Sequence, residues 1–336
     1  MSNPTEAQPF DVVAMGEILL EVATDVPFGH GVPAQLGISG DALNVAAAAA
    51  AAGARTALLA VLPDDDLGQA VAARIAELGI STELLKFRHG QQGVYLVHCD
   101  PDGQREFSYA RSGSVGSTLG PDDVDPGVIA AAGAVVAGGI ACAISTTSRA
   151  AVVKAAGLAR RFVYDPNFRP RLTSVEDATA ALTELAPHAF LVTPSFPGET
   201  RALLGVSSAE EAAAKLRSLG TDNVAVTCGA QGVQLEWDGD GKDGSEWVPA
   251  VPAPSVVDQT GAGDAFVGTL TARLVLGDDF PTAARYGAAA SSLVVGGKGG
   301  TGFVPSFDQT RRHAATAAGA TTPTTGADQG ALPSHA

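Results

Sequence analysis

The sequence predicts an α/β fold in which helices cover both faces of a mostly parallel sheet. Short apolar runs alternate with stretches of helical spacing, such as residues 67–78 and 209–219, and this alternation is typical of a parallel sheet. With 336 residues, 46% of them hydrophobic and 17% charged, the chain can bury a large core. The runs expected as buried strands are residues 12–15, 57–62, 134–140, 162–164, 190–193 and 224–227.

Two segments, residues 17–34 and 91–111, lack long helical periodicity. The second contains two strand-like runs around the turn Asp100-Pro-Asp-Gly103. We expect both segments to form a small β-sheet, a lid that projects from the core and covers a ligand site. From residue 311 to 336 the chain is mostly Ala, Thr, Gly and Pro, which predicts a disordered tail. The core is then expected at residues 10–16, 35–90 and 112–310.

Charge and cysteine content exclude several classes of protein. The 36 acidic and 21 basic residues give a net charge of −15, which argues against partners such as nucleic acid or an anionic membrane surface. Cys99, Cys142 and Cys228 are odd in number and far apart, so neither a disulfide framework nor a zinc site is expected. The polar first eleven residues do not resemble a signal peptide. We therefore expect a cytoplasmic protein.

The strongest chemical signal is a glycine-rich turn that opens a helix, Asp258-Gln-Thr-Gly-Ala-Gly-Asp264. Apolar residues recur every four positions from Phe266, which predicts the helix. The glycines allow a ligand to approach the backbone closely, and the free N–H groups of the first turn form an anion hole. Asp264 lies beside that hole, where it can accept a proton from a hydroxyl that attacks phosphorus. The alternative is that Asp264 only complements the helix dipole.

These residues resemble the C-terminal signature of the PfkB (ribokinase-like) carbohydrate kinases. Gly37-Ile-Ser-Gly-Asp-Ala-Leu-Asn-Val-Ala46 resembles the N-terminal glycine motif of that family, with Ser39 where a glycine is common. The resemblance covers about residues 11–310. It implies a ribokinase-like three-layer α/β/α core and ATP-dependent phosphorylation of a sugar hydroxyl. Asp264 would be the catalytic base, and the amides of Gly261, Ala262 and Gly263 would stabilise the transferred phosphoryl group.

The resemblance also implies where the cofactors bind. Residues 227–232 are similar to the nucleotide loop of the family, and Glu199 lies where the family organises Mg²⁺ through water. Asp258 and Thr260 would contribute to a site for a monovalent cation such as K⁺. Glu199 as an ordinary first-turn helix residue and Gly229 as an ordinary turn remain the alternatives. The residues assigned to ATP are Ser195, which replaces the usual Asn, and Thr227, Gly229, Gly232, Gly261 and Gly263.

The expected acceptor is a sugar or a sugar acid. Asp41 and Asn44 share one helix face and offer an acceptor and donors to a polyol, although Asp41 could instead be an N-cap. Arg111 ends the expected lid, and Arg169 ends Asp165-Pro-Asn-Phe-Arg169. Two guanidinium groups favour a sugar acid, because guanidinium pairs bidentately with carboxylate. Arg169 could instead contact an ATP phosphate or a surface acid.

Together these residues resemble the branch of the family that phosphorylates 2-keto-3-deoxygluconate, and fructokinases or other neutral-sugar kinases, such as ribose kinases, are the alternative. The resemblance assigns the acceptor to Gly40, Asp41, Asn44, Tyr95, Tyr109, Arg111, Arg169 and Asp264. The intact Gly261-Ala-Gly-Asp264 turn disfavours a sugar-sensing protein without catalysis. Gly297–Gly302 matches a dinucleotide fingerprint by letter, but no βαβ unit follows, so an oxidoreductase is not expected. The apolar strands of the lid could pair with a second copy in a homodimer.

Overall fold

An eight-stranded sheet runs through the centre of the computed structural model, which describes residues 9–99, 105–239 and 242–320. Its strand order is β14-β13-β12-β11-β10-β9-β1-β4, parallel from β12 to β4, with β13 and β14 added antiparallel. The mostly parallel sheet is therefore confirmed. The strands are β1 (Val12–Met15), β4 (Thr56–Leu59), β9 (Ala134–Gly138), β10 (Phe162–Asp165), β11 (Ala189–Val192), β12 (Asn223–Thr227), β13 (Gly232–Gly239) and β14 (Lys242–Pro249).

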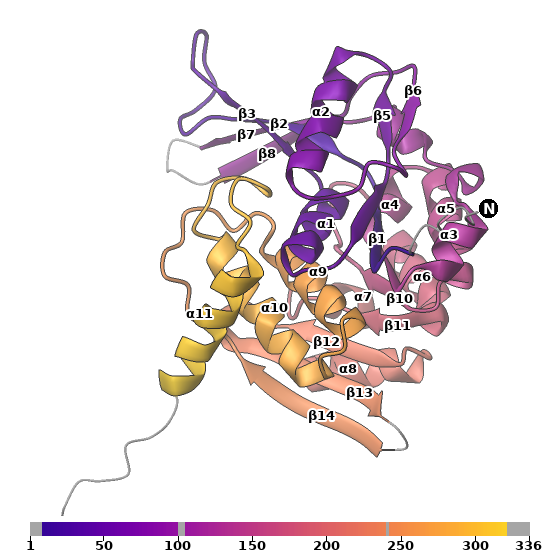
Figure 1. Cartoon of the computed structure of the whole chain (residues 1–336), viewed down its shortest axis with the longest axis vertical. Helices are drawn as coiled ribbons and strands as arrows, with labels where there is room; N and C mark the ends of the chain where they lie inside the picture. The colour runs from indigo at the N-terminus through magenta and orange to yellow at the C-terminus, as the bar shows by residue number, and fades with distance from the viewer. Residues whose placement is uncertain (1–8, 100–104, 240–241, 321–336) are drawn as a thin grey trace, which may run out of the picture.

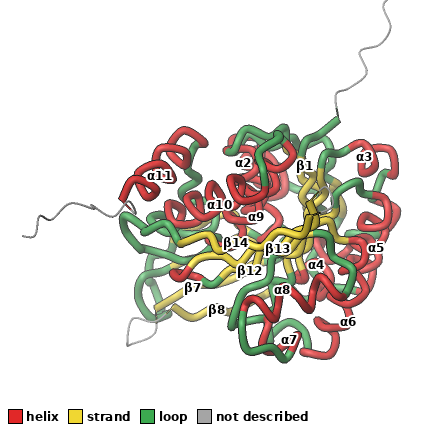
Figure 2. The backbone as a smooth tube through the Cα atoms, turned by 90° about the horizontal axis from the view of Figure 1, so that it is seen from below, coloured by secondary structure: helices red, strands yellow, loops and turns green. Residues whose placement is uncertain are grey.

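Helices cover both faces of this sheet (Figures 1 and 2). Side chains alternate along each strand, so that Val13 and Met15 of β1 enter one core cluster and Val12 and Ala14 enter the other. One face is covered by α1 (Asp41–Ala51), α2 (Asp66–Glu77), α9 (Ala262–Val275) and α10 (Phe280–Val294). The other is covered by α3 (Pro126–Ala131), α4 (Gly139–Ile144), α5 (Thr146–Leu158), α6 (Val175–Leu185), α7 (Thr200–Leu204) and α8 (Ala209–Ser218).

A separate four-stranded sheet, called here the small sheet, projects from the core with the order β3-β2-β7-β8 (Figure 1). Its strands are β2 (Leu19–Ala23), β3 (Gln35–Ser39), β7 (Val94–Cys99) and β8 (Arg105–Ala110). The expected boundary at residue 35 is wrong, because β3 pairs with β2 and extends the small sheet to Ser39. The predicted turn at residues 100–103 lies outside the described residues.

Two further expectations are corrected. The run 57–62 is not one strand: β4 ends at Leu59, and β5 (Val61–Pro63) pairs instead with β6 (Lys86–Arg88). Residues 311–320 belong to α11 (Phe307–Ala320), not to a disordered tail. A reciprocal pair of hydrogen bonds between Ser306 and Gln309 starts that helix, and its alanines have high helix propensity. Residues 321–336 lie outside the described part of the chain.

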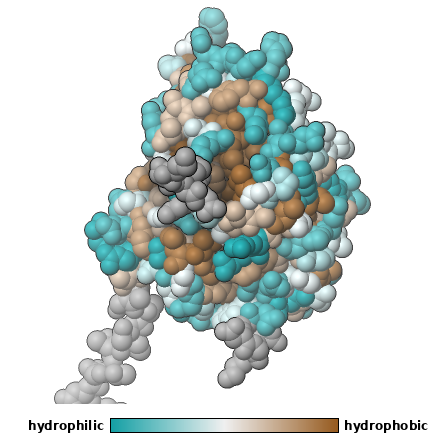
Figure 3. All heavy atoms as spheres, turned by 45° about the vertical axis from the view of Figure 1, so that its right-hand side comes forward, coloured by the Kyte–Doolittle hydropathy of each residue, from teal (hydrophilic) through white to brown (hydrophobic). Residues whose placement is uncertain are grey.

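The surface shown in Figure 3 carries hydrophilic residues over most of its outline, with hydrophobic residues in patches between them. Isolated apolar residues at a surface are ordinary in folded proteins. In the described part of the chain, no helix has the length and apolar character that a bilayer span requires. Cys142 and Cys228 are buried free thiols, as expected of small apolar residues in the core.

Candidate active site

The two helices that begin at the predicted site lack the side-chain caps of other long helices. α1 follows Gly40 (φ 137°) and α9 follows Gly261 (φ 80°), and neither start has a side-chain cap. The N–H groups of Gly263 and Asp264 in the first turn of α9 have no acceptor within the helix, so they are available to an anion. Side-chain caps are present at the starts of α2, α5, α6, α8 and α10, from Asp65, Ser145, Ser174, Ser208 and Asp279.

Asp264 is held by a chain of hydrogen bonds from α1. Asn44 Nδ2 donates to Asp264 Oδ2 at 2.8 Å, and Ser39 Oγ donates to Asn44 Oδ1 at 3.3 Å. Burial, followed by the charge of Asp41, raises the pKa of Asp264 to about 7, against the opposing effects of Asn44 and Arg169. A carboxyl group with this pKa is well matched to proton acceptance at neutral pH.

Asp41, Asp165 and Asp264 line one small cavity at the carboxyl ends of β1, β9 and β10. Asp41 is not the N-cap of α1, because Gly40 occupies that position, so that alternative is wrong. Burial raises the pKa of Asp41, and Arg111 and Arg169 oppose the shift. The sequence places Asp165 at the carboxyl end of a buried strand, where ligands bind in parallel sheets, but no role in the site was assigned to it. Burial and the charges of Glu199 and Asp264 raise the pKa of Asp165.

Gly40 is required by its backbone conformation and by its neighbour. A Cβ at Gly40 would lie 2.4 Å from the backbone oxygen of Glu17. At φ 137° a side chain would also be strained. This close approach places the start of α1 directly against the segment that leads from β1 into the small sheet.

One face of the small sheet presents polar side chains in a row. Glu21 of β2 is in register with Gly37 of β3 and Tyr95 of β7, and Tyr95 is in register with Tyr109 of β8. The Tyr95 hydroxyl donates a hydrogen bond to Glu21, and the two tyrosine rings lie 6.0 Å apart. Tyr95 is buried, whereas Tyr109 is 47% exposed. Glu21, which belongs to the Gly16-Glu17…Glu21 start that resembles the same branch of the family, was not among the residues assigned to the acceptor from the sequence.

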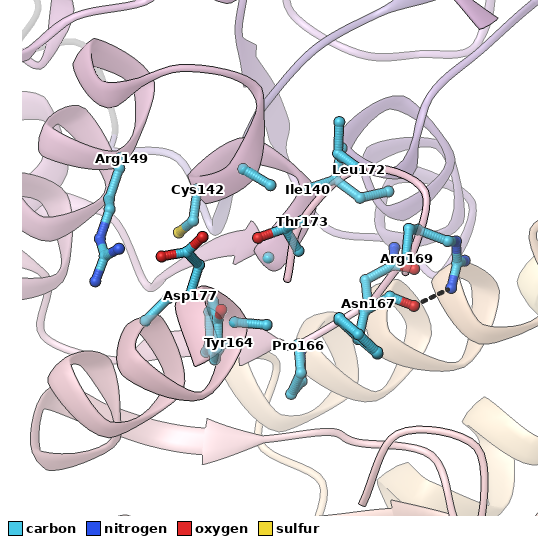
Figure 4. A pocket seen from close by; sticks show the side chains of 15 residues that line it. Ile140, Cys142, Arg149, Tyr164, Pro166, Asn167, Arg169, Leu172, Thr173 and Asp177 are labelled. Carbon is cyan, nitrogen blue, oxygen red and sulfur yellow. Dashed lines mark hydrogen bonds between the residues drawn. The ribbon is translucent and has the colours of Figure 1, made fainter. Parts of the chain in front are cut away.

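The two predicted arginines lie in different environments. Arg111 directly follows β8, packs over the Tyr109 ring at 5.7 Å and forms an ion pair with Glu17, whose side chain is 1% exposed. Arg169 is exposed and donates from Nη1 to the Phe168 oxygen at 3.3 Å (Figure 4). It forms no ion pair within the described residues, which disfavours a surface acid as its partner.

The loop after β10 borders a second small cavity (Figure 4), and Asn167 in this loop lines both this cavity and the one that contains Asp41, Asp165 and Asp264. Asn167 adopts φ 39° in this loop, and its N–H donates to Asp165 Oδ1 at 3.1 Å. Cys142 and Tyr164 line the far side of the cavity. Burial raises the pKa of the Cys142 thiol to about 12, so this cysteine is protonated at neutral pH and acts as a packing residue.

Glu199 joins two loops at the carboxyl edge of the sheet. Its Oε1 accepts from Phe168 N at 2.5 Å and its Oε2 accepts from Ser195 N at 2.7 Å. The side chain is 7% exposed. Glu199 does lie at the start of α7, but its carboxylate bonds outside that helix. Glu199 therefore connects the loop of Phe168 to the loop of Ser195, which a residue that only starts a helix would not do.

The predicted nucleotide loop follows β12 at the same edge. Thr227 N donates to Pro194 O at 2.9 Å, and Cys228 N donates to Gly232 O at 2.8 Å, which closes the loop. Gly229 and Gly232 have φ values of 56° and 133°. A Cβ at Gly232 would lie 2.3 Å from the oxygen of Val248, so this position requires glycine.

Asp258 braces the glycine turn. It is 5% exposed, its Oδ1 accepts from the N–H and hydroxyl of Thr260 at 3.0 and 2.8 Å, and its Oδ2 accepts from Gly299 N at 2.8 Å. Asp258 thus links the start of α9 to the loop that touches Glu21 of the small sheet, where Gly299 leaves no room for a side chain. No group of three or more acidic, histidine or cysteine side chains suited to a metal occurs in the described ranges.

A sequence model described as pfkB family carbohydrate kinase matches residues 11–306. The chain belongs to the pfkB family of carbohydrate kinases. The expectation of an ATP-dependent sugar kinase is confirmed. Asp264 lies in the first turn of α9, beside the glycine turn, and its role as the catalytic base stays a prediction.

This pfkB kinase is similar to several proteins of known name. It is 36% identical to the 2-dehydro-3-deoxygluconokinase of Thermoproteus tenax, over 90% of this chain and 94% of that one. It is 32% identical to fructokinase-1 of Zea mays, over 79% and 83%. A structure of a putative ribokinase II from E. coli in complex with ATP and Mg²⁺ superposes with a TM-score of 0.80 at 22% identity, over 91% and 99%. The ribokinase-like fold is thus confirmed.

Proposed function

We propose that this kinase transfers the γ-phosphoryl group of ATP to the primary hydroxyl of 2-keto-3-deoxygluconate. The observation that carries the proposal is the state of Arg111. Its Nε is buried without a hydrogen-bond acceptor, and its charge acts on Asp41 at the acceptor site. A buried donor edge of a guanidinium group is suited to a carboxylate that arrives with the substrate. The similarity to the enzyme of Thermoproteus tenax supports the same acceptor.

In the proposed reaction, Asp264 accepts the proton of the attacking hydroxyl. The hydroxyl oxygen forms a bond to the γ-phosphorus as the bond from that phosphorus to the bridging oxygen of ADP breaks. The amides of Gly261 and Gly263 donate to the phosphoryl oxygens as charge develops, whereas the Ala262 amide, also expected to contribute, donates to the Gln259 oxygen at 3.3 Å. Asn44 keeps the Asp264 carboxylate aligned through its 2.8 Å hydrogen bond. The small sheet closes as a lid and excludes water.

Cofactor positions are part of the same proposal. ATP lies along the loop that contains Thr227, Gly229 and Gly232, beside Ser195 and the glycine turn. Glu199 would hold Mg²⁺ through water, since each of its oxygens keeps a lone pair beyond the backbone hydrogen bond it accepts. The bound ion would neutralise charge on the phosphates. Asp258 and Thr260 form the proposed monovalent cation site, tested by replacing K⁺ with Na⁺ in the assay.

The experiment is an ADP-release assay with 2-keto-3-deoxygluconate, related keto-deoxy acids, fructose and ribose. Hydrogen bonds to charged groups contribute about 1.5–3 kcal/mol, so kcat/KM should favour the keto acid by about 10- to 150-fold. Arg111→Ala should remove this preference, whereas Arg285→Ala, at an exposed ion pair far from the site, should not. Equal or better turnover of fructose would instead support a fructokinase, the alternative favoured by the similarity to fructokinase-1.

We also propose that a second copy of the chain covers the outer face of the small sheet. Leu36, Val22 and Leu96 form an apolar row across three strands on the face opposite Tyr95. Leu36 is 73% exposed. An apolar face of this kind is suited to a twofold interface. The free, buried thiols of Cys142 and Cys228 support the related proposal that the kinase works in the cytoplasm.

A further inference from the structure

Glu17 is a buried carboxylate at the junction between the core and the small sheet, and the reaction described above assigns it no role. Its side chain is 1% exposed. It contacts Arg111 Nη2 and accepts a hydrogen bond from the Ser114 hydroxyl. Burying a charge is costly unless it is paired, so the Glu17 carboxylate and the Arg111 guanidinium depend on each other.

The surrounding chain is shaped to hold this carboxylate. A Cβ at Gly116 would lie 2.7 Å from Glu17 Cγ, and a Cβ at Gly93 would lie 2.6 Å from Leu19 Cδ2 and 3.0 Å from Glu17 Oε1. The absence of a side chain at these two glycines thus leaves the space that the Glu17 side chain occupies, and at Gly93 Leu19 shares in that restriction. Burial raises the pKa of Glu17, and Arg111 and Ser114 oppose that shift.

The same residues lie where the chain passes between the core and the small sheet. Glu17 lies between β1 and β2, Gly93 directly precedes β7, and Arg111 directly follows β8. Gln92 Nε2 donates to the Ile18 oxygen at 2.5 Å, which joins two of these passages. The Arg111 guanidinium is thus anchored at the base of the small sheet, while its Nε keeps no acceptor.

We propose that Glu17 is a positioning residue that makes the kinase selective for acidic acceptors, by holding Arg111 at Nη2 so that its buried Nε–H is presented to the substrate carboxylate. This inference rests on the proposed function. Fixing a long side chain before the substrate arrives removes the cost of ordering it from substrate binding, and a charge-assisted hydrogen bond from Nε then favours a carboxylate over a neutral group. The opposing effect is repulsion between the Glu17 and substrate carboxylates, and the proposal requires that positioning outweighs it.

The test is Glu17→Gln, which keeps the size of the side chain and its acceptor for Ser114 but removes the charge. KM for 2-keto-3-deoxygluconate should rise about tenfold, whereas kcat and the KM for fructose should change less than threefold. The effect should vanish in an Arg111→Ala background, because the two residues act as a unit. Glu246→Gln, at the exposed partner of Arg285, is the matched control and should leave both KM values unchanged.

Several outcomes would overturn the inference. These are equal KM changes for both sugars, an effect that persists in the Arg111→Ala background, or a lower KM for the keto acid, which would show that repulsion dominates. If Glu17→Gln does not fold, Ser114→Ala is measured instead, and its KM for the keto acid should rise by a smaller factor. If the wild-type enzyme prefers fructose, the proposed function is refuted but the role of Glu17 can still be tested. In that case the keto acid is measured as a competitive inhibitor of each variant, and Glu17→Gln should weaken that inhibition.

Discussion

Replacing Asp264 with asparagine removes the proposed base and little else. Asn44 Nδ2, now 2.8 Å from Asp264 Oδ2, can donate in the same way to an asparagine oxygen, so the start of α9 should keep its geometry. General-base catalysis contributes about 10²- to 10⁴-fold, so kcat should fall by that factor. KM for the sugar should stay within about threefold, because the other proposed acceptor residues are unchanged. Steady-state ADP release measures both constants.

The pH profile gives an independent measure of the same group. Asp264 must be ionised to accept a proton, and its pKa is raised to about 7, mainly by burial. The wild-type kcat/KM should therefore fall about tenfold for each pH unit below that value and level off above it. The Asp264→Asn variant should lack this acid limb. Because the raised pKa disfavours the ionised form in the folded state, the variant should melt at the same or a higher temperature at pH 8.

A matched control separates catalysis from helix electrostatics. Asp66 occupies the first turn of α2 and is exposed away from the site. If Asp264 only complemented a helix dipole, Asp66→Asn and Asp264→Asn would have similar small effects. Retention of more than about a tenth of kcat by Asp264→Asn would refute its role as the base.

Three other substitutions test the packing, the loops and the assembly. Gly40→Ala should lower the free energy of unfolding in urea by more than about 2 kcal/mol, because the new Cβ would clash with the Glu17 oxygen and the backbone at φ 137° would be strained. The control is Gly157→Ala, within α5, where a Cβ would meet no other atom. It should raise the free energy of unfolding by about 0.5–1 kcal/mol. Glu199→Gln places an NH₂ group opposite a backbone N–H, so it should lower the free energy of unfolding by about 1–3 kcal/mol in the same measurement. It should also raise the Mg²⁺ concentration needed for half-maximal activity. An unchanged Mg²⁺ titration would show that Glu199 only holds the two loops together. Leu36→Glu should convert a dimer to a monomer in light scattering, and a wild-type monomer would exclude the proposed interface.

The layered core was predictable because its determinants are local. Buried runs such as residues 12–15 and 224–227 contain β-branched and apolar residues, and the intervening segments have helical spacing, so each element is specified by its own sequence. The glycine turn was also predictable, because Asp264 and its glycines are contiguous. The sequence could not place the boundary of the small sheet, since β3 becomes a strand only through pairing with β2.

The parts of the site that the sequence missed depend on contacts between distant segments. Glu17 and Arg111 lie on separate passages of the chain, and nothing in either local pattern indicates that they pair. Similarly, Asp165 joins Asp41 and Asp264 only because parallel strands end at one edge of the sheet. The helix of residues 307–320 was missed because its composition of small residues resembles a linker, while its start depends on one Ser306–Gln309 pair.

The two faces of the small sheet carry different kinds of side chain, polar on one face and apolar on the other. Glu21 and Tyr95 lie on one face of β2 and β7, whereas Val22 and Leu36 lie on the opposite face of β2 and β3. Because neighbouring positions along a strand point to opposite faces, a one-residue insertion in β2 would exchange the two sets. If the proposed acceptor contacts and the proposed interface both hold, replacing these strands with those of another kinase would change both together. A change of acceptor contacts on one face of the small sheet would then be constrained by the assembly surface on the other.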